Sequence, residues 1–267
     1  MMATTSLRRA SLVMVAAIFC AAPGPATAMT ESGLTQMTGH KSSLKASIPN
    51  ARLDAVRGAG LSAGAAWGYY ETMRALESQI KAQSTGLDGV FNFAPFLLAG
   101  HVLPPVIEEA HDTAGFHSST EADFSRIMFR IVHPARIVSA TPNWRNWLLP
   151  PLAKPRPVNP VLLPETSAEK AVWSTAVKKG WATGAVQADN AMLDNVHRLE
   201  RNMRGILLFM RLRGQGLVHG PVVVAGAPSI RIGDRTLSVD SRTFQITLPA
   251  GFSRSQNFRV LIHGGAS

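Results

Sequence analysis

The side chains best suited to chemistry lie in one short stretch that brings carboxylates and imidazoles together: Glu108, His111, Asp112 and His117. Such groups bind zinc in many proteins. Their spacing is not that of a metalloprotease, because the H-E-x-x-H pattern is absent. Gly60-Leu61-Ser62-Ala63-Gly64 has the G-x-S-x-G spacing of serine hydrolases, but it lies within a stretch of helical periodicity and not at the strand-to-helix turn that the motif requires. The Walker A loop is absent. We therefore expect no metal, no cofactor and no catalytic activity.

The only cysteine, Cys20, lies in an N-terminal segment typical of a secretory signal peptide. Arg8 and Arg9 precede an apolar run, and Ala26-Thr27-Ala28 is a small-x-small cleavage site. We expect residues 1–28 to be a signal peptide and the chain to be exported. A second interpretation makes Cys20 the lipid-attachment residue of a bacterial lipoprotein. Phe19 fits that interpretation badly, because the peptidase prefers small residues before the cysteine, and mature N-terminal analysis distinguishes the two.

The composition combines a net charge of +10 with a charged fraction of only 16%. A basic balance favours anionic partners such as nucleic acid, lipid headgroups or acidic proteins. A low charged fraction leaves part of the surface apolar, as in a subunit that is covered within an assembly. No second apolar run is long enough to span a bilayer, which needs about 20 apolar residues.

Apolar periodicity predicts a first long helix from Asn50 to Lys81. Gly60, Gly64 and Gly68 recur every fourth residue, although a glycine costs a helix about 1 kcal/mol relative to alanine. Their register indicates that another backbone approaches this stripe closely. The alternative is a frayed or broken helix.

A second helical segment follows the capping box that Thr166 and Glu169 form. Its apolar stripe continues to Met210, and Gly214-Gln215-Gly216 ends it. The pattern predicts one long helix, or two that meet near Gly180 to Gly184. One face of this helix carries five arginines: Arg198, Arg201, Arg204, Arg211 and Arg213. Glu200 is the only acidic residue of the helix that we expect to offset their positive charge. This face is either simply solvated or a contact for an anionic partner.

The remaining segments predict an α+β protein, with long amphipathic helices packed with a small antiparallel sheet in a single domain. We expect a flexible N-terminus over 29–49, a turn at Gly86–Gly89 and short strands and turns over 90–106. Residues 124–138 then predict a strand pair, or one strand with a bend, interrupted at His133-Pro134. A proline-rich extended connector follows over 150–164.

The C-terminal part is predicted to be β-structure. The run from Pro221 to Gly226 has the composition of a buried strand. Alternating residues on both sides of Gly233-Asp234 predict a hairpin, and a further strand covers 242–248.

Six aromatic and proline residues stand out as a candidate partner interface: Phe91, Phe93, Pro104, Pro105, Trp144 and Trp147. Aromatic residues are enriched at protein interfaces, but core packing is the slightly favoured explanation for them. They belong to long strings that resemble the DotC family, whose conjugative-plasmid relatives are called TraI of the IncI type. These strings are FNFAPFLLAGHVLPPVIEEAHDT, TPNWRNWLL, AEKAVWSTAVKKGWATGAVQADNAML and IRIGDRTLSV. The similarity runs from about Asn50 to Phe258, and we take 50–263 as the DotC-like domain.

The resemblance implies a structural subunit of a type IVB (Dot/Icm-type) secretion or conjugation apparatus. Family members are outer-membrane lipoproteins that face the periplasm. With DotD they help to place DotH in the outer-membrane core complex, so DotD-like and DotH-like partners and a multi-subunit ring are expected. The competing interpretation is a stand-alone periplasmic binding module or hydrolase. A direct contact of the arginine face with DNA in transit is a third, less favoured hypothesis.

Overall fold

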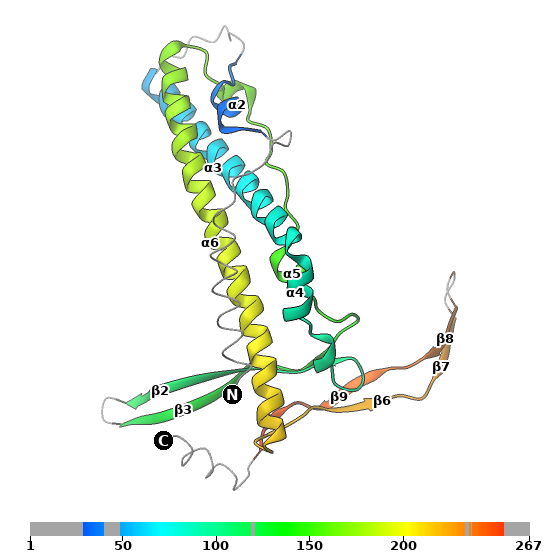
Figure 1. Ribbon diagram of the computed structural model, residues 1–267. Coiled ribbons are helices and arrows are strands. Elements are labelled where there is room, and N and C mark those ends of the chain that lie inside the picture. Colours follow the sequence, from blue (N-terminus) through cyan, green and yellow to red (C-terminus); the bar gives the residue numbers. More distant parts are fainter. Residues whose placement is uncertain (1–28, 40–48, 119–120, 233–234, 236, 254–267) are drawn as a thin grey trace. The chain divides into compact units, whose positions relative to one another are not determined.

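A computed structural model describes residues 29–39, 49–118, 121–232, 235 and 237–253 (Figure 1). The predicted signal peptide, Cys20 and the Gly233-Asp234 turn therefore lie outside the described residues. The chain divides into two compact units. Unit 1 comprises residues 1–86 and 145–197, and unit 2 comprises 87–144 and 198–267. Long helices and two-stranded antiparallel sheets confirm the α+β class.

Two long helices, α3 (Pro49–Ala82) and α6 (Ser167–Gly214), dominate the described chain. The first confirms the helix expected from Asn50 to Lys81. The second is one continuous helix of 48 residues, which decides between the two forms that the sequence left open. Its N-terminal part belongs to unit 1 and its C-terminal part to unit 2.

Within unit 1, α3 and α6 lie side by side in backbone contact along the glycine stripe (Figure 1). Gly60 faces Trp173, Gly64 faces Val177, and Gly68 faces Trp181. Both sequence positions increase together along the contact, so the two helices run parallel.

The contact is reciprocal, because α6 presents glycines of its own to α3. A β-carbon at Gly180 would lie 3.0 Å from the amide nitrogen of Ala65. One at Gly184 would lie 2.8 Å from the amide nitrogen of Tyr69. The close backbone approach that the glycine spacing predicted is thus confirmed. Such small-residue seams are best known from membrane helix pairs.

The proline-rich connector runs along α3 inside unit 1, antiparallel to the helix. The Lys154 ammonium lies 5.7 Å from the Trp67 ring centroid, while Arg52 donates to the carbonyl of Val161. The fifteen helical residues from Arg52 to Trp67 rise about 22 Å. Seven connector residues in polyproline geometry also span about 22 Å. The expected extended connector is confirmed, and only its end forms a 3-10 turn, η2 (Pro160–Leu162).

The N-terminal segment is more ordered than the sequence indicated over part of its length. A short helix, α2 (Glu31–Thr35), buries Leu34 completely, and the Trp173 indole donates to the Leu34 carbonyl at 3.0 Å. Burial of Leu34 holds residues that local composition alone would leave flexible. The core of unit 1 contains Leu34, Val56, Trp67, Leu163, Trp173 and Val177.

The turn expected at Gly86–Gly89 is wrong, because these residues lie in a short helix, α4 (Ser84–Val90). Leu87 of this helix is buried, and the Asp88 carboxylate accepts a hydrogen bond from the Trp144 indole at 2.7 Å. Tertiary contacts therefore outweigh the low helix propensity of the two glycines.

Unit 2 contains short β pairs and one long hairpin. Strand β1 (Val102–Leu103) pairs with β4 (Arg136–Ile137) and follows the 3-10 turn η1 (Ala94–Phe96), as expected for this region. Strand β2 (Val106–Ser118) pairs with β3 (Glu121–His133) in an antiparallel β2–β3 hairpin. The break at His133-Pro134 is confirmed, but the partner of β3 is a strand that the sequence did not reveal. In unit 1, the four-residue helix α5 (Arg145–Leu148) precedes the connector.

The C-terminal strands form nested antiparallel pairs that we call the β-arm, residues 218–252. Its pairs are β5 (Val218–His219) with β10 (Gly251–Phe252), β6 (Val222–Ala225) with β9 (Phe244–Leu248), and β7 (Ser229–Ile232) with β8 (Leu237–Ser241). A hydrogen bond from Gly226 to the Thr243 carbonyl bridges the second and third pairs. The strands were predicted, but the expected burial of β6 is wrong: Val222 and Val224 are 47% and 52% exposed. Their side chains are thus about half exposed, as on an open ribbon and not as in a core.

Candidate interaction surfaces

Most of the predicted aromatic interface is buried within unit 2 itself. Phe91, Phe93 and Trp144 are less than a tenth exposed, and Pro104 and Pro105 are also buried. Residues Asn92 and Asn143 form an isolated antiparallel bridge between the two motifs. Trp147, which belongs to unit 1, is half-buried. Of the six residues, therefore, Trp147 is the one whose side chain a partner can reach in this arrangement.

All five arginines of the α6 face are exposed, and carboxylates of the described residues accompany at least three of them. Arg204 pairs with Glu200 on the same helix at 3.1 Å. Arg201 pairs with Glu108, and Arg211 pairs with Glu109, each at 3.4 Å. Exposed pairs of this kind are each worth about 0.2–1 kcal/mol. They reduce the positive charge that the arginine face presents to an anionic partner.

A glycine of α6 places the two glutamates against the arginines. A β-carbon at Gly205 would lie 2.9 Å from the carbonyl oxygen of Ile107 and would clash with Val106. The base of the β2–β3 hairpin therefore crosses α6 at this glycine, and Glu108 and Glu109 follow directly in sequence. Ile107, Phe209, Leu212, Leu217 and Val218 form the core beneath them.

Sequence reasoning missed this arrangement because β2 was not recognised as a strand. The opposition to the arginines comes from residues about a hundred positions away, which no helical period reveals. The available signal was Gly205, a single glycine within an otherwise apolar stripe of the helix. Such a glycine in a helix indicates close backbone approach.

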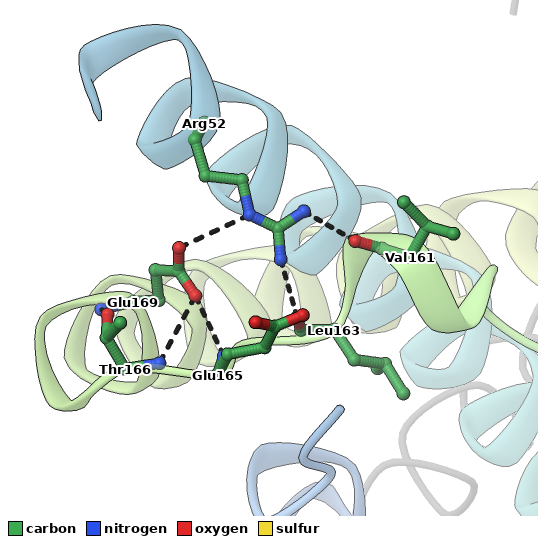
Figure 2. Close-up of polar contacts among 6 residues, drawn as sticks. All are labelled: Arg52, Val161, Leu163, Glu165, Thr166 and Glu169. Atoms are coloured by element: carbon green, nitrogen blue, oxygen red, sulfur yellow. Dashed lines mark hydrogen bonds and ion pairs between the residues drawn. The ribbon is translucent and has the colours of Figure 1, made fainter. Parts of the chain in front are cut away.

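A polar cluster at the start of α6 joins three segments of unit 1 (Figure 2). The Arg52 guanidinium of α3 lies 3.2 Å from Glu169 and donates to the carbonyls of Val161 and Leu163 in the connector. Glu169 also accepts from the amides of Glu165 and Thr166, and the Thr166 hydroxyl accepts from the Glu169 amide. The predicted capping box is confirmed, but Arg52 was not foreseen as its partner.

The electrostatics of this cluster favour an ionised Glu169. Burial alone would raise the pKa of this carboxyl. The amides of Glu165 and Thr166 and the Arg52 guanidinium outweigh burial and hold the pKa below its ordinary value of 4.5. The cluster is thus a structural clamp between the connector and both helices.

Large apolar side chains are exposed on the β-arm and the β2–β3 hairpin. On the arm, Ile230 is 66% and Ile232 is 82% exposed. On the hairpin, Ile127 and Met128 are also exposed. Apolar side chains on strands with unpaired edges are typical of surfaces that another protein covers.

The described ranges contain no group of three or more metal-binding side chains, and Glu108 and Glu109 pair with arginines instead. Within the same ranges, no helix is long and apolar enough to cross a bilayer.

The family comparison agrees with these observations. The model of the family described as "Type IV secretory system, conjugal DNA-protein transfer" (T4SS_TraI) matches residues 50–258. This range includes both long helices, the connector, the hairpin and the β-arm. A search of curated proteins found no match to the chain. The family match covers most of the sequence, so the chain belongs to the T4SS_TraI family and is a component of a type IV secretion and conjugation system.

Proposed function

We propose that the chain is a structural and assembly subunit of the outer-membrane core complex of a type IVB (Dot/Icm-type) secretion or conjugative transfer system. In this role it helps to place a DotH-like partner in the outer membrane, together with a DotD-like protein. It acts on the periplasmic face, after export by the segment 1–28, and performs no catalysis.

The observation that carries this proposal is the exposed apolar surface of the β-arm, at Val222, Val224, Ile230 and Ile232. A two-stranded ribbon is marginally stable in water, and exposed aliphatic residues on it invite association. A subunit that packs against other subunits covers such a surface, whereas a monomeric enzyme has no use for it. The family match supplies the apparatus in which those subunits are found.

Attachment to the membrane follows one of two routes in this proposal. Lipidation of Cys20 anchors the chain directly, whereas cleavage after Ala28 leaves anchoring to its partners. Mass spectrometry of the mature N-terminus distinguishes them, because only the first route retains residues 20–28 and adds the mass of a lipid.

The experiment that tests the role is deletion of the gene followed by fractionation of the envelope. We expect the DotH-like partner to accumulate in the inner membrane, and the restored gene to return it to the outer membrane. Normal outer-membrane localisation of that partner in the deletion strain would contradict the proposal. A normal rate of conjugation or effector transfer in that strain would contradict it as well.

A further inference from the structure

The β2–β3 hairpin and the β-arm both have strand edges that no further strand pairs with in the described residues. There, each is built only from two-stranded pairs. A lone pair of strands is marginally stable in water and leaves unpaired backbone groups along both edges. Both ribbons nevertheless carry exposed aliphatic side chains, including Ile127 and Met128 on the hairpin and Ile230 and Ile232 on the arm.

The base of the hairpin is the part that contacts α6 within unit 2. Val106 and Ile107 contact Gly205, and Glu108 and Glu109 pair with arginines of α6. Strand β2 has 13 residues, which extend about 44 Å at roughly 3.4 Å per residue. The register places Glu121 and Ser118 opposite each other at the far end from Val106. Most of the hairpin therefore extends beyond its contact with α6.

The two ribbons differ in charge although the whole chain is basic. Residues 106–133 contain five carboxylates and two arginines, so the hairpin is acidic within a chain of net charge +10. The β-arm contains three arginines and two aspartates. Glu108 and Glu109 pair with arginines of α6, and the three other carboxylates of the hairpin sequence lie at positions 112, 121 and 123. With histidines neutral, the hairpin has a net charge of −3 and the arm of +1, so the two ribbons are opposite in sign. Both also have unpaired strand edges that can form hydrogen bonds.

We propose that the β-arm of one copy docks on the β2–β3 hairpin of a second copy, through strand edges and exposed aliphatic side chains. The contact joins two different surfaces, so it is heterologous and repeats from copy to copy. Heterologous contacts close into rings or extend into filaments. The inference concerns copies of this chain and does not depend on the outer-membrane role.

Cysteine cross-linking in cells that carry the complete apparatus tests this contact. The only native cysteine is Cys20, and the parent protein measures its background. Met128→Cys and Ile232→Cys are produced together as two distinguishably tagged chains, and a mild oxidant is added. We expect a mixed disulfide between the hairpin variant and the arm variant that exceeds both homodimers severalfold. A matched control replaces the hairpin variant with Val186→Cys, whose parent residue is 58% exposed on α6.

The charge contribution is tested with Arg235→Glu in the chain that carries the arm substitution. This change should lower the mixed product severalfold, whereas Arg156→Glu, an exposed residue of the connector, should leave it unchanged. Three outcomes overturn the proposal: no mixed product above the control, a dominant arm-to-arm homodimer, or cross-linking of either introduced thiol to a different protein. Because the readout is a defined disulfide, it is independent of where the DotH-like partner localises.

Discussion

Gly64 of α3 lies against the backbone of α6, where a β-carbon would clash with the Val177 carbonyl and lie 3.0 Å from the Trp181 amide nitrogen. The obstructing atoms are backbone, so they cannot rotate away as a flexible side chain can. The first prediction follows: Gly64→Ala should destabilise the protein by roughly 1–3 kcal/mol, the cost of overpacking a close contact. Urea unfolding followed by circular dichroism measures the change.

Gly58 provides the matched control for that substitution. It lies on the same helix, is exposed, and a β-carbon there would meet nothing within 4 Å. Because alanine is the better helix former, Gly58→Ala should stabilise the protein by up to about 1 kcal/mol. Equal effects of the two substitutions would show that helix propensity, not backbone contact, governs the stripe.

The second prediction concerns the pH dependence of stability at Glu169. Its folded-state pKa lies below its ordinary value of 4.5, so the ionised form is favoured by folding. The stabilisation is therefore fully present above the unfolded-state pKa and is lost as the pH falls through the folded-state value. Glu169→Gln should reduce stability at neutral pH and flatten the acid limb of the stability curve.

Asp54→Asn is the control for this pH dependence. Asp54 also pairs with an arginine, Arg57, but the pair is exposed on the surface of α3. Its replacement should change stability by no more than about 1 kcal/mol. Chemical denaturation of both variants at neutral and acidic pH makes the comparison. An acid limb that Glu169→Gln leaves unchanged would be incompatible with the clamp.

The sequence predicted the helical half of the fold well because its determinants are local and periodic. The apolar period located both helices, and the spacing of Gly60, Gly64 and Gly68 indicated the backbone contact. The capping box of Thr166 and Glu169 located the start of α6 within one residue.

What the sequence did not reveal depends on contacts between distant residues. Glu108 and Glu109 interrupt the apolar alternation of β2, so the strand was missed, and with it the carboxylates opposite the arginine face. The buried Leu34 orders α2 through a contact with Trp173, which is 139 positions away. The exposure of β6 was also missed, because a run of valines has the same composition in a buried strand and on an open ribbon.

The third prediction concerns Asp189, on the part of α6 in unit 1. Burial raises the pKa of this carboxyl. The charged form is thus disfavoured by folding, and stability is lost as the pH rises above the ordinary value of 3.8. Asp189→Asn should raise the melting temperature at neutral pH, and its effect should disappear at acidic pH, where the native carboxyl is protonated.

Asp194→Asn is the corresponding control, since Asp194 is exposed on the same helix. It should leave the melting temperature nearly unchanged, because surface substitutions away from special contacts lie within about 0.5 kcal/mol. Thermal unfolding across the acid range compares the two variants. A destabilising Asp189→Asn would mean that the carboxylate makes a favourable contact that outweighs its burial.

The fourth prediction tests how the hairpin is positioned and whether that position matters for transfer. Gly205→Val places a branched side chain where the Ile107 carbonyl lies within 2.9 Å of a β-carbon, so the hairpin base must move away from α6. The Arg201–Glu108 and Arg211–Glu109 pairs should separate as a result. We expect faster amide exchange over residues 106–111, unchanged exchange in α3, and reduced conjugation.

Gly214→Ala is the matched control on the same helix. A β-carbon there meets nothing within 4 Å, so this variant should behave as the parent. Wild-type transfer by a Gly205→Val protein with a displaced hairpin would show that the hairpin position is dispensable, whereas wild-type exchange would show that Gly205 does not position it.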